Sequence, residues 1–76
     1  MNFPQYRKYK NDLSYFKIES NDRFIEWKRM INNWEEIEIE ATILPDRVFI
    51  MDMLEVNSLY WDVISEKEFN SFLKSI

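Results

Sequence analysis

The 76-residue chain contains no glycine, so other residues must form any turn that needs a positive φ angle. Asn and Asp tolerate that conformation best after Gly. Pairs that contain one of them recur along the chain, at Asn11-Asp12, Asn21-Asp22, Asn32-Asn33, Pro45-Asp46 and Asn57-Ser58. These pairs divide the sequence into segments of roughly ten to thirteen residues, a spacing typical of short antiparallel strands joined by tight turns.

The chain is short enough that we expect residues 1–76 to form a single domain with one core. It has no Cys and no His, so it lacks the side chains for a disulfide or a zinc site that stabilise many small proteins. It does carry six Phe, four Tyr and three Trp, each of which can bury a large apolar area. Apolar packing, oligomerisation or both must therefore stabilise it.

The clearest strand pattern covers residues 35–44, where Ile37 and Ile39 alternate with Glu36, Glu38 and Glu40. A period of two places the Ile side chains on one face and the Glu side chains on the other. Segments rich in β-branched and aromatic residues predict further strands at 4–10, 13–19, 47–54 and 59–64, of which 13–19 and 47–54 are expected to be covered on both faces.

Residues 21–34 fit a helix or a strand, and we favour a strand at 23–31. The reason is its pairing with the next segment: a three-residue connection sets Trp27 opposite Ile39 and Lys28 opposite Glu38. Apolar side chains then face each other, and so do opposite charges. A two-residue turn would set Trp27 against Glu38 and mix the two faces.

The pattern changes at Ser65, where Ser-Glu-Lys-Glu has the form of a helix capping box with Glu68 at the third helical position. Phe69, Phe72 and Leu73 then follow at helical spacing, which predicts a helix at 66–75. The fold expected is α+β: an antiparallel sheet or small curled barrel of five to six strands with one C-terminal helix.

Catalytic chemistry is poorly represented in the sequence. Without His or Cys, the usual general base and the most easily activated nucleophile are missing. A chain without glycine also has no Gly-rich phosphate loop or dinucleotide fingerprint. We therefore expect a protein that is not an enzyme and needs no cofactor. No segment has the character of a signal peptide or membrane anchor, so a cytoplasmic location is expected.

Charge is distributed unevenly. Residues 1–31 hold seven Lys or Arg against four Asp or Glu, whereas residues 32–76 hold three against ten. The ladder Glu36, Glu38 and Glu40 is a candidate partner-binding surface, either by itself or with other acidic residues as an imitation of nucleic-acid phosphates. The alternatives are a solvated strand face, a protected strand edge and a hard-cation site. The further acidic residues considered for this surface are Glu35, Asp46, Asp52, Glu55 and Asp62.

Three aromatic residues beside predicted turns, Trp34, Tyr60 and Trp61, are further candidates for partner binding, because Trp and Tyr are enriched among residues that carry interface energy. Core packing is the alternative role for them. A homo-oligomer that hides surplus aromatic side chains is an alternative function.

The N-terminal segment interleaves aromatic rings and positive charges, a combination that stacks bases and neutralises phosphates. Strand alternation, with rings inward and lysines outward, gives the same pattern. RNA or DNA binding is therefore a second alternative function. The candidate residues are Tyr6, Arg7, Lys8, Tyr9, Lys10 and Lys17.

Several strings of the chain resemble those of small uncharacterised bacterial proteins of similar length, and this resemblance implies no activity. The strings are Tyr6-Arg7-Lys8-Tyr9, Ser14-Tyr15-Phe16-Lys17-Ile18, Ile43-Leu44-Pro45-Asp46-Arg47 and the segment from Trp61 to Phe69. By type alone, the chain is also similar to the small, acidic, cysteine-free inhibitors that phages direct against bacterial defence, including anti-CRISPR proteins. The expected function is thus that of a protein-binding module that inhibits or regulates a larger bacterial protein machine. In the most specific form of this hypothesis, the machine is an RNA-guided nuclease.

Overall fold

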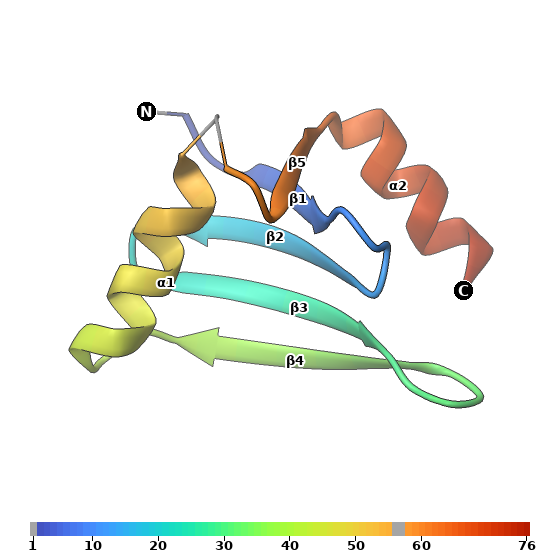
Figure 1. Ribbon diagram of the computed structural model, residues 1–76, viewed down its shortest axis with the longest axis horizontal. Helices are drawn as coiled ribbons and strands as arrows, with labels where there is room; N and C mark the ends of the chain where they lie inside the picture. Colours follow the sequence, from blue (N-terminus) through green and yellow to red (C-terminus); the bar gives the residue numbers. More distant parts are fainter. Residues whose placement is uncertain (1, 56–57) are drawn as a thin grey trace.

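The computed structural model describes residues 2–55 and 58–76, which form one five-stranded sheet and two helices. All strand pairs are antiparallel, and the strand order across the sheet is β4-β3-β2-β1-β5 (Figure 1). The elements are β1 (Gln5–Tyr9), β2 (Ser14–Ser20), β3 (Arg23–Arg29), β4 (Trp34–Glu40), α1 (Leu44–Leu54), β5 (Trp61–Ile64) and α2 (Glu66–Ser75).

The sheet separates two hydrophobic cores, because both of its faces are partly covered. On one face Phe16, Ile18 and Phe24 pack under α1, and on the other Tyr6 and Trp27 pack under α2. Figure 1 shows α1 near the C-terminal ends of β2 and β4, and α2 toward the opposite ends of these strands. Neighbouring residues of a strand therefore contribute to different cores.

The turns between the first strands form where the Asn-Asp pairs predict them, and the strands at 4–10, 13–19, 23–31 and 35–44 are confirmed with changed bounds. β1 and β3 are shorter than predicted, β2 is shifted by one residue, and β4 begins one residue earlier and ends four residues earlier. Asp12 supplies a positive φ of 62° in the β1–β2 turn, as expected in a chain without glycine. Residues 61–64 of the segment predicted at 59–64 form β5. For the predicted turn Asn57-Ser58, Asn57 lies outside the described residues.

The predicted register of the β3–β4 hairpin is wrong. Trp27 lies opposite Glu36, not Ile39, and Lys28 lies opposite Glu35, not Glu38. The connection is also longer than expected, since residues 30–33 join the strands and the Met30 amide donates to the Asn33 carbonyl at 2.7 Å. The rule of pairing apolar with apolar residues gave the wrong register because Trp27 packs in the core under α2 and needs no apolar partner on β4.

The strand predicted at 47–54 and the turn predicted at Pro45-Asp46 are also wrong, because residues 44–54 form α1. Pro45 lies in the first turn, where its missing amide hydrogen breaks no helical bond. Ile50 and Met53 bury one side of the helix against the sheet. A strand in this place would have left Phe16 and Phe24 uncovered, so the need to close this core decides in favour of a helix.

The C-terminal helix is confirmed as α2 with the predicted bounds. The Ser65 hydroxyl accepts a hydrogen bond from the Glu68 amide at 3.0 Å, and Lys74 in the last turn complements the helix dipole. Phe69 and Phe72 are buried against the sheet. This element was predictable because both its cap and its apolar stripe are local features.

We expect Ser65→Ala to lower the free energy of unfolding by about 1 kcal/mol, because the Glu68 amide would lose its acceptor at a helix N-terminus. Urea unfolding followed by circular dichroism measures this change. Ser71→Ala, at an exposed position within the same helix, is the control and should leave stability within about 0.5 kcal/mol. Equal effects of the two substitutions would contradict the capping role.

The sheet is open, so the curled barrel considered for this sequence is wrong, and β4 and β5 are its two edges. The α+β class and the antiparallel sheet are confirmed, with five strands and with α1 as an additional helix. Within residues 2–55 and 58–76, neither helix has the length and apolarity needed to cross a membrane.

Candidate functional site

Arg7, a candidate for nucleic-acid binding, is used inside the protein. Its side chain is 2% exposed, and its Nε donates to the Met53 carbonyl at 2.7 Å. One terminal nitrogen donates to the Tyr6 carbonyl at 2.8 Å, and the other donates to Gln5 Oε1 at 2.7 Å. Burial lowers the pKa of the guanidinium. Arg7 therefore joins β1 to the C-terminal end of α1 and presents no charge to a nucleic-acid phosphate.

Of the other basic candidates, Lys8 and Lys10 form ion pairs within the protein, and Lys17 lies on a different strand. Lys8 forms an ion pair with Asp12, whose hydrogen bond raises the pKa of Lys8. Lys10 pairs with Asp62 at 2.6 Å, and this hydrogen bond lowers the pKa of Asp62. Lys17 is half-buried on β2.

The aromatic candidates of the same segment lie on opposite faces of the sheet. Tyr6 packs on Phe69 of α2, and Tyr9 packs on Phe16 and Trp61 in the core under α1. Burial is the main reason that the pKa values of both tyrosines are raised. The structure does not bring these rings and the lysines together as one stacking surface.

The aromatic residues beside the turns lie at opposite edges of the sheet. Trp34 begins β4 and packs on Phe72 of α2, with ring centroids 4.8 Å apart. Trp61 begins β5 and packs on Tyr9 and Phe49. Tyr60 is 68% exposed, whereas the other twelve aromatic side chains, all within the described residues, are buried or half-buried. Apart from Tyr60, the fold itself thus covers the aromatic residues that a homo-oligomer was expected to hide.

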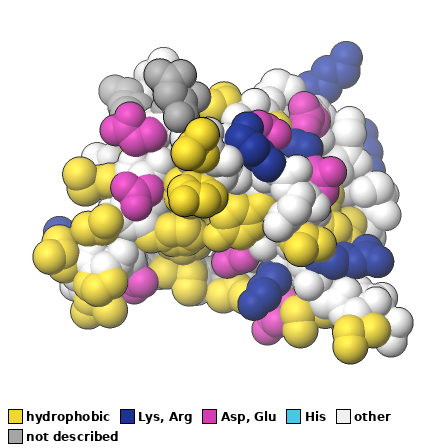
Figure 2. All heavy atoms as spheres, viewed as in Figure 1, with side chains coloured by type: hydrophobic (Ala, Val, Ile, Leu, Met, Phe, Trp, Pro, Cys, Tyr) yellow, Lys and Arg dark blue, Asp and Glu magenta, His cyan; other side chains and the backbone are white. Residues whose placement is uncertain are grey.

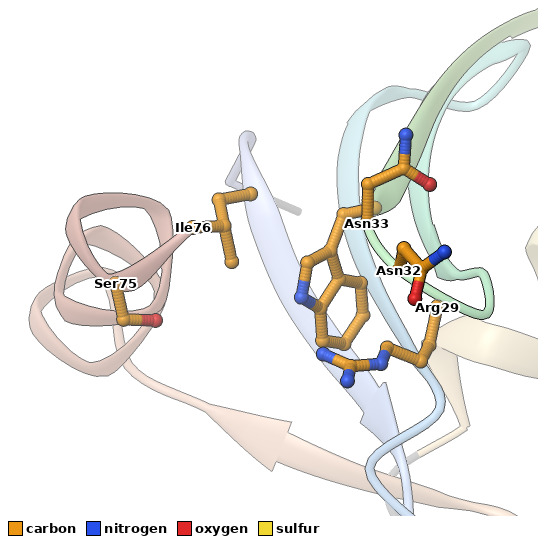
Figure 3. A pocket seen from close by; sticks show the side chains of 6 residues that line it. Arg29, Asn32, Asn33, Ser75 and Ile76 are labelled. Carbon is orange, nitrogen blue, oxygen red and sulfur yellow. The ribbon is translucent and has the colours of Figure 1, made fainter.

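A cavity of about 460 Å³ lies between the C-terminal end of α2 and the β3–β4 loop (Figure 3). Ile76 points toward this space, whereas the Asn32 and Asn33 amides point away from Ile76. The Arg29 guanidinium carbon lies 5.6 Å from the centre of the Trp34 ring. A cation of the protein therefore already occupies a face of the ring that a planar ligand would need.

The acidic residues do not gather on one surface. Glu36, Glu38 and Glu40 are exposed and share the face of β4 that α2 partly covers, whereas Glu35 lies on the other face. Asp46 and Asp52 belong to α1, Glu55 follows it, and Asp62 lies on β5 at the other edge of the sheet. Among the described residues, no group of three or more carboxylates is placed to hold a metal ion.

An apolar stripe on the outside of α1 is a feature that the sequence interpretation did not predict. Leu44, Val48 and Met51 are 72%, 44% and 65% exposed, and their i, i+4, i+7 spacing places them along one side of the helix. Ile50 and Met53 bury the opposite side. Figure 2 shows hydrophobic side chains gathered over this helix, at the left of the view. We call Leu44, Val48 and Met51 the α1 outer stripe.

The sequence contains a signal for this stripe that the strand prediction concealed. Because α1 is apolar on its buried and on its outer side, the segment shows no alternation between one apolar and one polar helical face. If Pro45 is placed in the first turn of a helix, Leu44, Val48 and Met51 fall at the spacing of residues that share one side of that helix.

Comparisons of the chain with models of protein families, with curated proteins and with solved structures gave no match.

Proposed function

We propose that the chain is a non-enzymatic protein-binding module whose main contact is the α1 outer stripe. The observation that carries the proposal is the exposure of Leu44, Val48 and Met51 on the side of α1 opposite the buried one. Contiguous exposed apolar residues mark interaction surfaces. The absence of His and Cys from the sequence supports a role without catalysis.

The proposed partner is a larger bacterial protein that this module inhibits or regulates. The net charge of −4 favours a partner with a basic surface. In its narrowest form the proposal makes the chain an anti-CRISPR-type inhibitor, since RNA-guided nucleases hold their guide–target duplex in a positively charged channel. That form predicts that the purified protein slows DNA cleavage by a host nuclease in vitro.

Nucleic-acid binding has less support as a function, because the Arg7 guanidinium is bonded within the protein and Lys8 and Lys10 are paired with carboxylates. A homo-oligomer would have to use exposed apolar residues such as those of the α1 outer stripe, since the aromatic side chains are largely packed within the fold.

We expect the double substitution Val48→Glu with Met51→Glu to weaken partner binding at least about tenfold, because charges would replace two of the three apolar contacts of the stripe. Stability should change by less than about 1 kcal/mol, since both side chains lie outside the core. Quantitative affinity purification from the host, with wild-type and variant baits, measures the loss of captured partner.

The matched control is Leu13→Glu with Ile31→Glu, which places two acidic residues at exposed apolar positions outside α1. It should capture as much partner as the wild type. Equal capture by all three proteins would contradict the proposal. Light scattering tests the oligomer separately: a wild-type dimer that the stripe variant converts to a monomer would show that a second copy, and not another protein, covers the stripe.

A further inference from the structure

The outer edge of β4 carries backbone groups that do not bond to β3. The Met30 amide donates to the Asn33 carbonyl and the Ala41 amide donates to the Asp22 carbonyl, at 2.7 and 2.6 Å. Both bonds belong to the register in which Arg29 faces Trp34. In an antiparallel ladder, bonded and non-bonded pairs alternate. The residues of β4 that bond to β3 are therefore Glu35, Ile37 and Ile39.

The alternate residues, Glu36, Glu38 and Glu40, lie in non-bonded pairs with β3. Their N–H and C=O groups consequently point away from the sheet, toward the outer edge, where the Glu40 carbonyl already accepts a hydrogen bond from the Thr42 amide at 3.0 Å. The same three residues carry the exposed carboxylates of β4. Hydrogen-bonding groups for a further strand and a row of negative charge thus coincide on one edge.

The two faces beside this edge differ in chemistry. On the face toward α1, Ile37 and Ile39 are half-buried, and Ile39 packs on the core that contains Phe24. On the other face, Glu38 is paired with Arg23 at 3.7 Å. In the ranges that the structure describes, Glu36 and Glu40 have no ion pair. Unbalanced charge therefore remains at Glu36 and Glu40 on one face, whereas the other face carries apolar Ile37 and Ile39 beside the exposed Glu35.

These features disfavour two candidate binding partners for the outer edge of β4. A second copy of β4 paired antiparallel about Ile37 would place Glu36 against Glu38 of the other copy, and like charges directly opposite are destabilising. A nucleic-acid strand would bring phosphates toward the same carboxylates. The complementary occupant is a protein strand that supplies positive charge on one face and apolar side chains on the other.

We propose that β4 binds an extended segment of a partner protein in which Lys or Arg alternates with apolar residues, and that the segment adds to the sheet as a sixth, antiparallel strand. Its basic side chains lie opposite Glu36, Glu38 and Glu40, and its apolar side chains extend the surface of Ile37 and Ile39. The inference rests on the proposed role in protein binding, but it uses a surface separate from the α1 outer stripe.

The probe for this site is the capped heptapeptide Lys-Val-Lys-Val-Lys-Val-Lys, titrated into isotopically labelled protein and followed by NMR. We expect the largest amide shifts at Glu36, Glu38 and Glu40, whose N–H groups would gain acceptors. A peptide of the same composition with its lysines grouped at one end should bind more weakly, because its charges cannot match the period of the strand. Equal shifts from both peptides, or shifts centred on another segment, would overturn the inference.

Backbone methylation tests strand addition without altering the protein. In the peptide, methylation of the backbone nitrogens of the two inner lysines should abolish binding, because in antiparallel pairing those N–H groups face β4. Methylation of two valine nitrogens should preserve binding, since those groups point outward. Equal sensitivity at both sets of positions would contradict strand addition.

Charge is tested with Glu36→Gln and Glu40→Gln together, which should weaken binding of the unmethylated peptide about fivefold. Asp52→Asn with Glu55→Gln removes the same charge from α1 and its C-cap, and should leave the affinity unchanged. An equal loss in both variants would show general charge attraction only and would overturn the site. If the wild-type protein does not bind the peptide but the α1 stripe variant still captures less partner, only this inference is refuted and the proposed function stands.

Discussion

Replacing Phe16 by Ala is expected to lower the free energy of unfolding by about 3–5 kcal/mol. Phe16 is fully buried on β2 and packs against Tyr9, Phe24 and Phe49. The substitution would leave a cavity beneath α1 that a small domain cannot readily close. Because the total stability of a chain this size is about 5–10 kcal/mol, a large share of it would be lost.

Thermal or urea unfolding followed by tryptophan fluorescence measures this loss. Tyr60→Ala removes an exposed aromatic side chain and serves as the control, with an expected change below about 1 kcal/mol. Comparable destabilisation by the two substitutions would contradict the placement of Phe16 at the centre of this core.

Replacing Arg7 by Met is the second change with a large expected effect, a loss of about 3–5 kcal/mol in unfolding free energy. Met retains most of the apolar length of the side chain but leaves the Met53 and Tyr6 carbonyls without the donors that Arg7 supplies. Removing the hydrogen-bond partner of a buried polar group costs about 1–3 kcal/mol for each group left unsatisfied. The cost lies toward the upper end of this range when the lost partner is charged.

Urea titration of the purified variants gives the free energy. The control is Lys17→Met, which removes a positive charge from the neighbouring strand β2, where the side chain is half-buried, and should cost less than about 1 kcal/mol. Amide exchange adds a local measurement: in Arg7→Met, the C-terminal part of α1 should lose protection before the rest of the sheet. An Arg7 variant as stable as the control would show that the guanidinium does not fasten α1 to β1.

Arg7 also shows that one sequence pattern can fit two different structural roles. Rings and positive charges alternate from Tyr6 to Lys10, which fits both a nucleic-acid surface and an ordinary strand. The choice depends on what lies over each face. Since α1 places the Met53 carbonyl 2.7 Å from Arg7 Nε, this cation became part of the interior, which no property of residues 6–10 alone could reveal.

The proposed binding surfaces were predictable to different degrees. The exposed Glu ladder of β4 follows from alternation alone, and the structure places Glu36, Glu38 and Glu40 on one face as expected. The direction of their backbone groups depends on the hairpin register, which was predicted wrongly because it is set by the two cores on either side of β3. The α1 outer stripe was not predictable from the pattern of residues 47–54, because that pattern indicates a strand and not a helix.

The sequence by itself determined the elements whose signals are local. Asn and Asp pairs placed the early turns of a glycine-free chain, the Ile and Glu alternation defined β4, and Ser65 with its following apolar stripe defined α2. Tertiary structure decided the state of residues 44–54, the β3–β4 register and the burial of Arg7. Each of these depends on which surfaces remain to be covered once the sheet has formed, and that requirement arises from residues distant in the chain.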